Sequence, residues 1–271
     1  MKQKFNEHTA PFSYITSPLL DDWGIPHAFT RRWGGVSEGV YSTFNFATGN
    51  GEKPDRWYNV MMNHRIAASL FCLTEKEICR TYQTHSTEVR IVDERHRGVG
   101  TVNAPFEQGV DGLVTGERDL ILSVRGADCV TILFFDVVKK ICGACHSGWR
   151  GTADKIAARV VEKMVSLGAD PKNILVAIGP SVGGCCYTVG SEVENAFLAS
   201  DGDFTLCFNR DGEHLKLDLQ RAVELTLLKA GVPESNISDC GECTVCDGGK
   251  HYFSHRLCGV DRGTMAAFIR I

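Results

Sequence analysis

Short apolar runs alternate with turn-forming residues along most of the chain, and this pattern predicts a series of β-strands. The runs are rich in valine and isoleucine and are bounded by glycine, aspartate or proline, which is typical of buried strands. The predicted strands cover residues 87–93, 111–116, 120–126, 129–136, 139–146, 174–180 and 214–219.

Helical spacing of apolar residues is clear in two segments. Residues 152–168 carry an apolar stripe that closes on Gly168, and residues 218–231 carry another that closes on Gly231. A third helix is predicted over residues 57–71. Because the strands outnumber the helices and come in runs, the pattern favours the α+β class, with mixed β-sheets flanked by helices in a single layered domain over residues 1–271.

Composition and charge narrow the class of protein. The 271 residues are 43% hydrophobic and 23% charged, as in ordinary globular proteins. The net charge of −4 gives no reason to expect a nucleic-acid partner, and the longest apolar run, "VTILFFDVV", is far too short to cross a membrane. The N-terminal segment lacks the apolar core of a signal peptide, so we expect a cytoplasmic protein whose twelve cysteines are reduced thiols.

Three residues of metal-ligand type lie at the ends of predicted strands. His85 precedes one strand, Cys129 opens a second and His146 closes a third. Two imidazoles and a thiolate suit zinc and leave a fourth position for water or substrate. The spacing matches no compact zinc finger, so exposed loop histidines with a core cysteine are the plainer interpretation. Asp128 is a candidate hydrogen-bond partner for a ligand imidazole.

The turn "HSGWRGT" begins at His146 and leads into the helix predicted at residues 152–168. Unpaired backbone N–H groups and the helix dipole at such a turn favour an anion, and Arg150 adds a charge and a forked donor. The sequence therefore indicates a phosphate or substrate subsite made by Ser147, Gly148, Trp149, Gly151 and Thr152. In the plainer alternative, the glycines only form the turn and Thr152 only caps the helix.

Two further segments are rich in cysteine. The glycine-rich turn at residues 178–190 holds vicinal Cys185 and Cys186, either of which is a candidate nucleophile. A Cys-x-x-Cys-x-x-Cys pattern near the C-terminus is followed by more ligand-type residues, and the set is Cys240, Cys243, Cys246, His251, His255 and Cys258. Zinc or iron–sulfur binding is chemically reasonable there, although apolar packing is the commoner role of single cysteines.

Taken together, these stretches resemble the laccase-domain family, described first as polyphenol oxidase and later as zinc-dependent purine nucleoside phosphorylase and adenosine deaminase. The matching pieces, in order, are "FTRRWGGVSEGVY", "QTHSTEV", "DGLVT", "GADCVTILFFD", "HSGWRGT", "AIGPSVGGCCYTVG" and "CTVC" with "YFSHR". They extend from about residue 28 to the C-terminus. The whole set in this order is specific, whereas any single piece is not.

The resemblance implies that His85, Cys129 and His146 bind the metal, which is zinc or alternatively copper. It implies purine nucleosides and phosphate as partners, and a layered fold similar to a glutamine-deamidating toxin domain that uses cysteine and histidine. Further residues matching the family around the pocket are Arg32, Gln83 and Arg150. Asp128 and Glu242 are the candidates for a general acid or base, and the oligomeric state is left open.

The chain departs from the usual family pattern at several positions. Gly184 stands where the family usually has proline, and Cys145 stands where it usually has alanine. Near the C-terminus, Leu257 and Cys258 replace an Arg-Asp pair, and Arg262 precedes the closing glycine instead of following it. The sequence therefore assigns no role to this arginine, while the metal-ligand motifs are intact.

The favoured function is phosphorolysis of adenosine, inosine and guanosine together with deamination of adenosine, and three alternatives remain. Copper-dependent polyphenol oxidation needs many histidines in close pairs, but the chain has nine histidines and no His-x-His pair. A cysteine hydrolase would use a thiolate instead of a metal. A metal or redox sensor without enzyme activity would use the cysteine-rich C-terminal segment.

Overall fold

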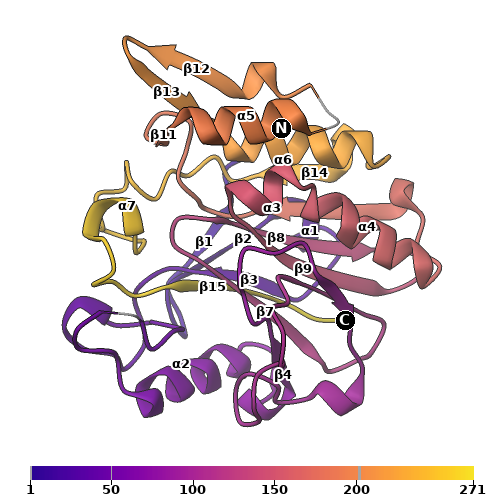
Figure 1. The fold of residues 1–271 in the computed structure, drawn as a ribbon. Helices are drawn as coiled ribbons and strands as arrows, with labels where there is room; N and C mark the ends of the chain where they lie inside the picture. The colour runs from indigo at the N-terminus through magenta and orange to yellow at the C-terminus, as the bar shows by residue number, and fades with distance from the viewer. Residues whose placement is uncertain (1, 50, 201–202) are drawn as a thin grey trace.

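Two six-stranded β-sheets lie face to face at the centre of the molecule (Figure 1). The computed structural model describes residues 2–49, 51–200 and 203–271. In sheet order, the first sheet contains β1 (Asn6–His8), β2 (Tyr14–Thr16), β3 (His27–Thr30), β15 (Met265–Ile269), β7 (Ile121–Gly126) and β4 (Ile78–Arg80). The second contains β14 (Ile237–Asp239), β10 (Ile174–Ile178), β8 (Val130–Asp136), β9 (Ile141–Ser147), β6 (Gly112–Thr115) and β5 (Val89–Ile91). A smaller sheet contains β11 (Thr188–Val189), β13 (His214–Leu217) and β12 (Phe208–Asp211).

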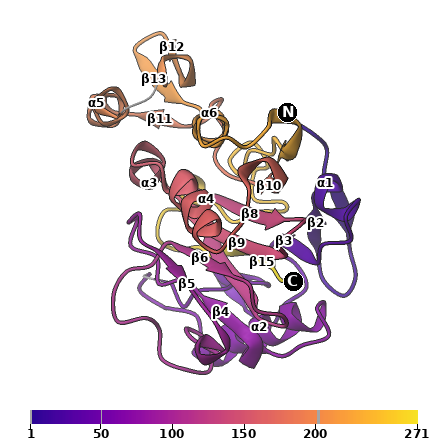
Figure 2. The ribbon, with the colours of Figure 1, turned by 90° about the vertical axis from the view of Figure 1, so that its right-hand side faces the viewer.

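Helices flank these sheets (Figure 2). They are α1 (Pro18–Asp21), α2 (Trp57–Ser69), α3 (Trp149–Ala153), α4 (Ile156–Ser166), α5 (Ser191–Ala199), α6 (Leu219–Lys229) and α7 (His255–Cys258). Short 3-10 helices occupy Gly39–Tyr41, Glu75–Glu77, Glu94–His96, Pro171–Asn173, Thr205–Cys207 and Glu234–Asn236. The predicted α+β class is confirmed, because both large sheets combine parallel with antiparallel pairs.

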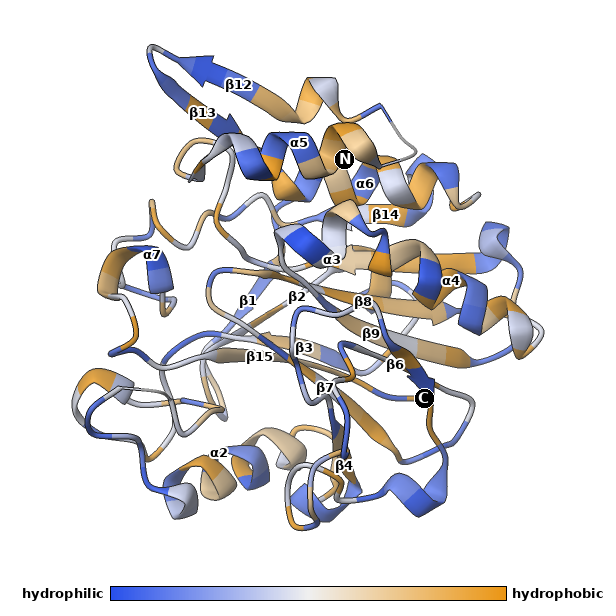
Figure 3. Ribbon diagram, viewed as in Figure 1, coloured by the Kyte–Doolittle hydropathy of each residue, from blue (hydrophilic) through white to orange (hydrophobic). Residues whose placement is uncertain are grey.

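Strand β8 shows how the sequence produces this layering. Successive side chains of a strand point to opposite faces, and in β8 both faces are apolar, as the hydropathy colours of Figure 3 show. Ile132 and Phe134 belong to the core beneath α4 and α6, whereas Leu133 and Phe135 belong to the core between the two large sheets. Burial on both faces explains why the run at residues 129–136 is apolar without interruption.

The outer layers follow from the same alternation. Ala67 and Ala68 of α2 pack in one cluster with Phe268 of β15, which places α2 on the outer face of the first sheet. Helix α4 packs on the second sheet through Val160 and Met164, and the small sheet stands with α5 and α6 at one end of the molecule (Figure 1). No helix within the described part of the chain has the length and apolar character that a bilayer crossing needs.

The predicted strands are all present, and the helices expected at residues 57–71 and 218–231 are confirmed as α2 and α6. The prediction of a single helix at residues 152–168 was wrong. The helical segment begins earlier, at Trp149. It is divided into two helices, α3 and α4, because Lys155 between them adopts the left-handed conformation with φ of 61°. A residue in this conformation interrupts the helix, and the change of direction turns Ile156 into the core.

Candidate metal centre

The structure brings His85, Cys129 and His146 together where strands β8 and β9 of the second sheet meet, at the start of β8 and the end of β9. The Sγ atom of Cys129 lies 3.8 Å from Nε2 of His85, and the two imidazole rings are 4.9 Å apart between centroids. One potential ligand atom from each residue lies within 4.8 Å of the other two. The sequence prediction that these three side chains converge therefore agrees with the geometry.

The strand register explains this convergence. Strands β8 and β9 are antiparallel, with Thr131 opposite His146, so the start of β8 lies beside the end of β9. Cys129 immediately precedes β8 and is thereby placed beside His146. His85 reaches these two strand ends from the loop before β5, where its backbone takes the left-handed conformation with φ of 61°.

Asp111 is the residue that organises this centre, and sequence reasoning assigned it no role. Its fully buried carboxylate accepts backbone N–H bonds from Thr84, His85 and Ser86 at 3.0, 3.2 and 2.9 Å. The same carboxylate lies 2.8 Å from Nδ1 of His146, which carries the hydrogen of this bond. The bond therefore turns Nε2 of His146 towards the other two residues. This arrangement is typical of metal-ligating histidines, whose second nitrogen binds a carboxylate.

Electrostatics favour the charged forms of Cys129, His146 and Asp111 at neutral pH. Burial opposes ionisation of the Cys129 thiol, but His146 and His85 outweigh it and lower the pKa of Cys129 to about 6. Burial likewise opposes the charged form of His146, but Cys129 and Asp111 raise its pKa to about 9. Burial is also outweighed at Asp111, where His146 and the backbone amides lower the pKa to about 2. Without a metal, the centre is thus a thiolate and imidazolium pair beside a carboxylate.

A cavity of about 520 Å³ opens over the centre, and two arginines line it with the three candidate ligands. The Nε atoms of Arg125 and Arg262 are buried and have no hydrogen-bond partner among the described residues. Burial and the nearby charge of Arg262 lower the pKa of Arg125 to about 10, and burial lowers the pKa of Arg262. His255 also lines the cavity, and its Nδ1 bonds to the carbonyl of Gly259 at 2.8 Å.

The sequence pattern did not indicate Arg125, Arg262 or His255 as residues of this cavity, for identifiable reasons. Arg125 lies inside a predicted strand and belongs to no motif. Arg262 lies in the segment that departs from the family pattern, and His255 was considered only with the C-terminal cysteines. Two desolvated arginines facing the same cavity are a physical signal for an anion, but this signal exists only in the folded chain.

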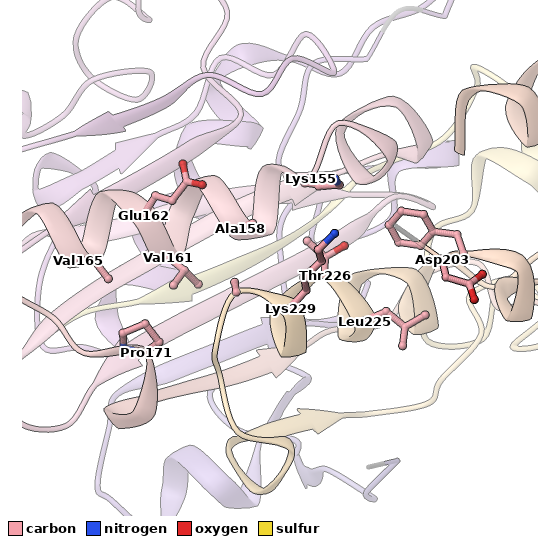
Figure 4. Close-up of a pocket in the computed structure, with 12 residues that line it drawn as sticks. Lys155, Ala158, Val161, Glu162, Val165, Pro171, Asp203, Leu225, Thr226 and Lys229 are labelled. Atoms are coloured by element: carbon pink, nitrogen blue, oxygen red, sulfur yellow. The ribbon is translucent and has the colours of Figure 1, made fainter. Parts of the chain in front are cut away.

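A different cavity, of about 560 Å³, lies between α4 and α6 and contains none of the residues selected from the sequence (Figure 4). Apolar side chains such as Val161, Val165 and Leu225 form much of its wall, with charged residues such as Glu162 among the others. No cysteine or histidine lines it, in contrast to the cavity over the metal centre.

Of the four residues expected to be catalytic, Gln83 lines the cavity and Arg32, Asp128 and Arg150 do not. The guanidinium of Arg32 bonds to the carbonyls of Ser42 and Gly249 and does not line the pocket. Arg150 is exposed and stacks on Trp149, with 4.2 Å between the guanidinium carbon and the ring centroid.

Gln83 lines the cavity, and Asp128 is flanked in the chain by Ala127 and Cys129, which line it. The amide of Gln83 is bound to both the N–H and the carbonyl of Arg125. Asp128 is buried and accepts bonds from Oγ1 of Thr244 at 2.6 Å and the N–H of Arg256 at 2.7 Å. The expectation that Asp128 orients a ligand imidazole is therefore corrected, since Asp111 does so. Glu242, the other acid or base candidate, instead accepts a bond from the Tyr252 hydroxyl at 2.7 Å.

The turn after His146 packs against the centre through its backbone. A Cβ on Gly148 would lie 2.7 Å from Cδ2 of His85 and 3.1 Å from Sγ of Cys129, so only glycine fits there. The hydroxyls of Ser147 and Thr152 are buried and bond to each other at 2.8 Å, so these side chains are already paired. Gly151 is buried as well, and Trp149 packs against the core beneath α3.

Cys185 and Cys186 lie away from the pocket lining, beside Cys243 and Cys246. Burial and the neighbouring thiols raise the pKa of Cys185 to about 11, and they raise that of Cys186 further. These raised pKa values disfavour the thiolate form that a nucleophile at Cys185 or Cys186 would need. Cys240 is buried in the core between the large sheets, where burial raises its pKa, and Cys258 is exposed.

Known proteins are similar to this chain over most of its length. The family model described as "Multi-copper polyphenol oxidoreductase laccase" matches residues 26–271. The chain is 32% identical to "Purine nucleoside phosphorylase YlmD" of Bacillus subtilis over 96% of each chain. It is 32% identical to "Purine nucleoside phosphorylase LACC1" of Mus musculus over 95% of this chain, but it spans only 58% of that protein. It is 38% identical to "Adenosine deaminase RL5" of an unknown prokaryotic organism, over 67% of this chain and 70% of that protein.

A solved structure shows the same arrangement of elements. A crystal structure of the Bacillus licheniformis hypothetical protein YfiH superposes with a TM-score of 0.89 at 28% identity, and the match covers 98% of each chain. The layers described above are therefore those of a known fold.

Proposed function

The chain belongs to the family described as multi-copper polyphenol oxidoreductase laccase, and we propose from this premise that it is a zinc-dependent enzyme of purine nucleosides. Its reactions would be phosphorolysis of adenosine, inosine and guanosine, and deamination of adenosine. Relatives that carry the names of these two activities support the proposal. The observation that carries it is the convergence of two histidines and a cysteine on one cavity that two buried arginines also line.

The donor set of His85, Cys129 and His146 fits zinc. Two imidazoles and a thiolate are ligands that zinc prefers, and three protein ligands leave a position open, as in catalytic sites. The carboxylate of Asp111 holds one imidazole in the orientation that metal binding needs. A zinc ion held there would supply an activated water at neutral pH. Copper is the alternative occupant, because imidazole and thiolate also bind it tightly.

The copper chemistry implied by the family description lacks the ligands it would need. A multicopper oxidase combines a mononuclear centre with a cluster of several copper ions, and both require many histidines. Within the described residues, only one potential metal-binding group contains histidine, and it contains two. The donor set therefore supports a single ion rather than an oxidase cluster.

Arg125 and Arg262 suit the phosphate of phosphorolysis. An inorganic phosphate between two desolvated guanidinium groups would receive charge-assisted bonds and relieve their mutual repulsion. One phosphate oxygen then attacks ribose C1′ while the bond from C1′ to the purine nitrogen breaks, giving ribose 1-phosphate and a purine base. The base needs a proton as it leaves, and the candidate donor is the imidazolium form of His255, whose Nδ1–H is held by the Gly259 carbonyl and whose Nε2–H is available for transfer.

Deamination would use the same cavity without phosphate. Water adds at purine C6, the amino group leaves as ammonia, and adenosine becomes inosine. The test is chromatography of adenosine and inosine after incubation with zinc-loaded protein, with and without phosphate. We expect inosine from adenosine in either buffer, and free bases with ribose 1-phosphate only when phosphate is present. Unchanged nucleosides under all conditions would remove the basis of the proposal.

Arg262→Ala is expected to impair phosphorolysis and to spare deamination. Loss of one charge-assisted bond to phosphate corresponds to about 1.5–3 kcal/mol, so the KM for phosphate should rise about 10-fold to 100-fold. The measurement is the initial rate of inosine cleavage over a range of phosphate concentrations. Arg150→Ala is the matched control, because Arg150 is exposed and outside the cavity, and its KM for phosphate should stay within about 2-fold of the unchanged protein. Equal effects of the two substitutions would contradict the phosphate assignment.

Hydrolysis by a cysteine nucleophile is a second candidate, and one observation favours it. Cys129, His146 and Asp111 form a series of nucleophile, base and orienting carboxylate, and the pKa of Cys129 is lowered to about 6. Iodoacetamide treatment of metal-free and zinc-loaded protein separates the two functions. If zinc is the cofactor, bound zinc protects Cys129 from alkylation and turnover requires zinc. A cysteine hydrolase would instead turn over its substrate in the presence of a chelator.

A further inference from the structure

Two segments far apart in the sequence bring four thiols together outside the cavity. We call this group the four-cysteine cluster, and its members are Cys185, Cys186, Cys243 and Cys246. The Sγ atom of Cys246 lies 3.4 Å from that of Cys185 and 3.4 Å from that of Cys186. All four sulfur atoms lie within 4.8 Å of one another. The cluster contains no residue of the candidate metal centre.

The sheet topology explains why these segments meet. Strands β10 and β14 are parallel neighbours, so the chains that follow them leave the second sheet side by side. Backbone pairing continues beyond the strands, with Ser181 bridged to Cys243. The N–H of Ser181 bonds to the carbonyl of Glu242 at 3.3 Å, and the N–H of Thr244 bonds to the carbonyl of Ser181 at 3.0 Å. The pairs of cysteines are therefore held by backbone hydrogen bonds.

The backbone also prepares one sulfur for the negative charge of a thiolate. The N–H of Gly183 points to Sγ of Cys243 at 3.2 Å. The N–H groups of Val245 and Cys246, within the Cys-x-x-Cys turn, also help to lower the pKa of the Cys243 thiol. Amide hydrogens directed at a sulfur stabilise its thiolate, which is the form that binds a metal.

The sulfur separations fit a metal site and do not fit a disulfide. A disulfide requires an S–S distance of about 2.05 Å, which is far shorter than the 3.4 Å between the sulfurs of Cys185 and Cys246. A tetrahedral zinc ion with Zn–S bonds of about 2.3 Å separates its sulfurs by about 3.8 Å. The two shortest sulfur–sulfur distances in the cluster are 3.4 Å, and no pair of its sulfurs is more than 4.8 Å apart, so the separations bracket the roughly 3.8 Å of a tetrahedral site.

We propose that the four-cysteine cluster binds one zinc ion in a closed site that stabilises the fold. Each of the four sulfurs forms a bond to the ion, and each thiol that was protonated releases its proton to solvent. No oxidation or reduction takes place. Four thiolates leave no position for water or substrate, so this site does not catalyse a reaction. The proposal is independent of the nucleoside chemistry.

The position of the cluster indicates what the ion would stabilise. Thr244, which lies between Cys243 and Cys246, donates its hydroxyl hydrogen to Asp128. Asp128 also receives the N–H of Arg256 and directly precedes Cys129. The segment from Cys243 onward carries His255 and Arg262 to the wall of the cavity. A zinc ion in the cluster would therefore anchor the C-terminal wall of the cavity to the second sheet.

Metal analysis by mass spectrometry tests the proposal on the full chain, purified with a reductant and loaded with zinc chloride. We expect two zinc ions per chain in the unchanged protein, one in His146→Ala and one in Cys246→Ser. The matched control is Cys258→Ser, which removes an exposed cysteine from the same segment and should keep two. One zinc ion in the unchanged protein and none in His146→Ala would overturn the proposal. A disulfide within the cluster of the reduced, zinc-loaded protein would overturn it as well.

Cobalt substitution keeps the proposal testable if Cys246→Ser fails to fold. In His146→Ala, whose other centre is disabled, bound Co²⁺ should show the intense thiolate-to-cobalt absorption of a four-sulfur tetrahedral site. Removing the zinc from His146→Ala with a chelator should also lower its unfolding temperature by at least about 5 °C. An unchanged unfolding temperature, or a cobalt spectrum without thiolate bands, would contradict a stabilising zinc site.

Discussion

Replacement of His146 with alanine is expected to abolish turnover of adenosine and inosine, with a loss of at least about 100-fold in kcat/KM. Substitutions next to metal ligands already reduce affinity or activity by about 10-fold to 100-fold, so loss of a ligand should cost at least as much. His146 has two partners at once, because Nδ1 bonds to Asp111 and the ring faces Cys129. Alanine removes a metal ligand and leaves the Asp111 carboxylate without its imidazole.

The measurement is kcat/KM with zinc in excess, accompanied by the zinc content and the unfolding temperature. His214→Ala is a suitable control, since His214 is an exposed residue of β13 and lies outside both potential metal-binding groups. His146→Ala should lose one zinc ion per chain while remaining folded, and His214→Ala should retain full activity. Wild-type rates in a folded His146→Ala protein would exclude the three-residue centre as the site of turnover.

The strands and the candidate ligands were predictable because their signals are local. The apolar run of β8 and the polar residues at its start follow each other in the sequence, and so do the end of β9 and His146. Two antiparallel strands joined by a short turn must bring those ends together. The sequence pattern alone therefore indicates that Cys129 and His146 lie close together.

Residues that act through long-range contacts were not predictable in this way. Asp111 directly precedes β6 and has the sequence signature of a turn residue, yet in the fold its carboxylate orders the loop of His85 and the ring of His146. Arg262 comes from the C-terminal segment and reaches the cavity from the opposite end of the chain. Conversely, Arg150 has the strongest local signal for an anion but is exposed and stacked on Trp149. Local pattern shows what a residue can do, whereas tertiary contacts decide what it faces.

Asp111 substitutions are expected to produce the second large effect, and here metal binding and stability change together. Asp111→Ala leaves three part-buried backbone N–H groups without their acceptor and the buried His146 without its carboxylate, so the free energy of unfolding should fall by about 3–5 kcal/mol. Asp111→Asn keeps the shape of the side chain but loses the charge and one acceptor. We expect this milder variant to fold and to bind zinc about 10-fold to 100-fold more weakly.

The pH dependence of stability separates the charge of Asp111 from its shape. The folded protein lowers the pKa of Asp111 to about 2 from an ordinary value of 3.8, so the carboxylate stabilises the fold above pH 4 and this contribution disappears as the pH falls towards 2. The shift corresponds to about 2 kcal/mol. Denaturant unfolding of metal-free protein between pH 5 and pH 2 should show this loss in the wild type and not in Asp111→Asn. Parallel curves for the two proteins would mean that the carboxylate charge contributes nothing, and that Asp111 acts through its shape alone.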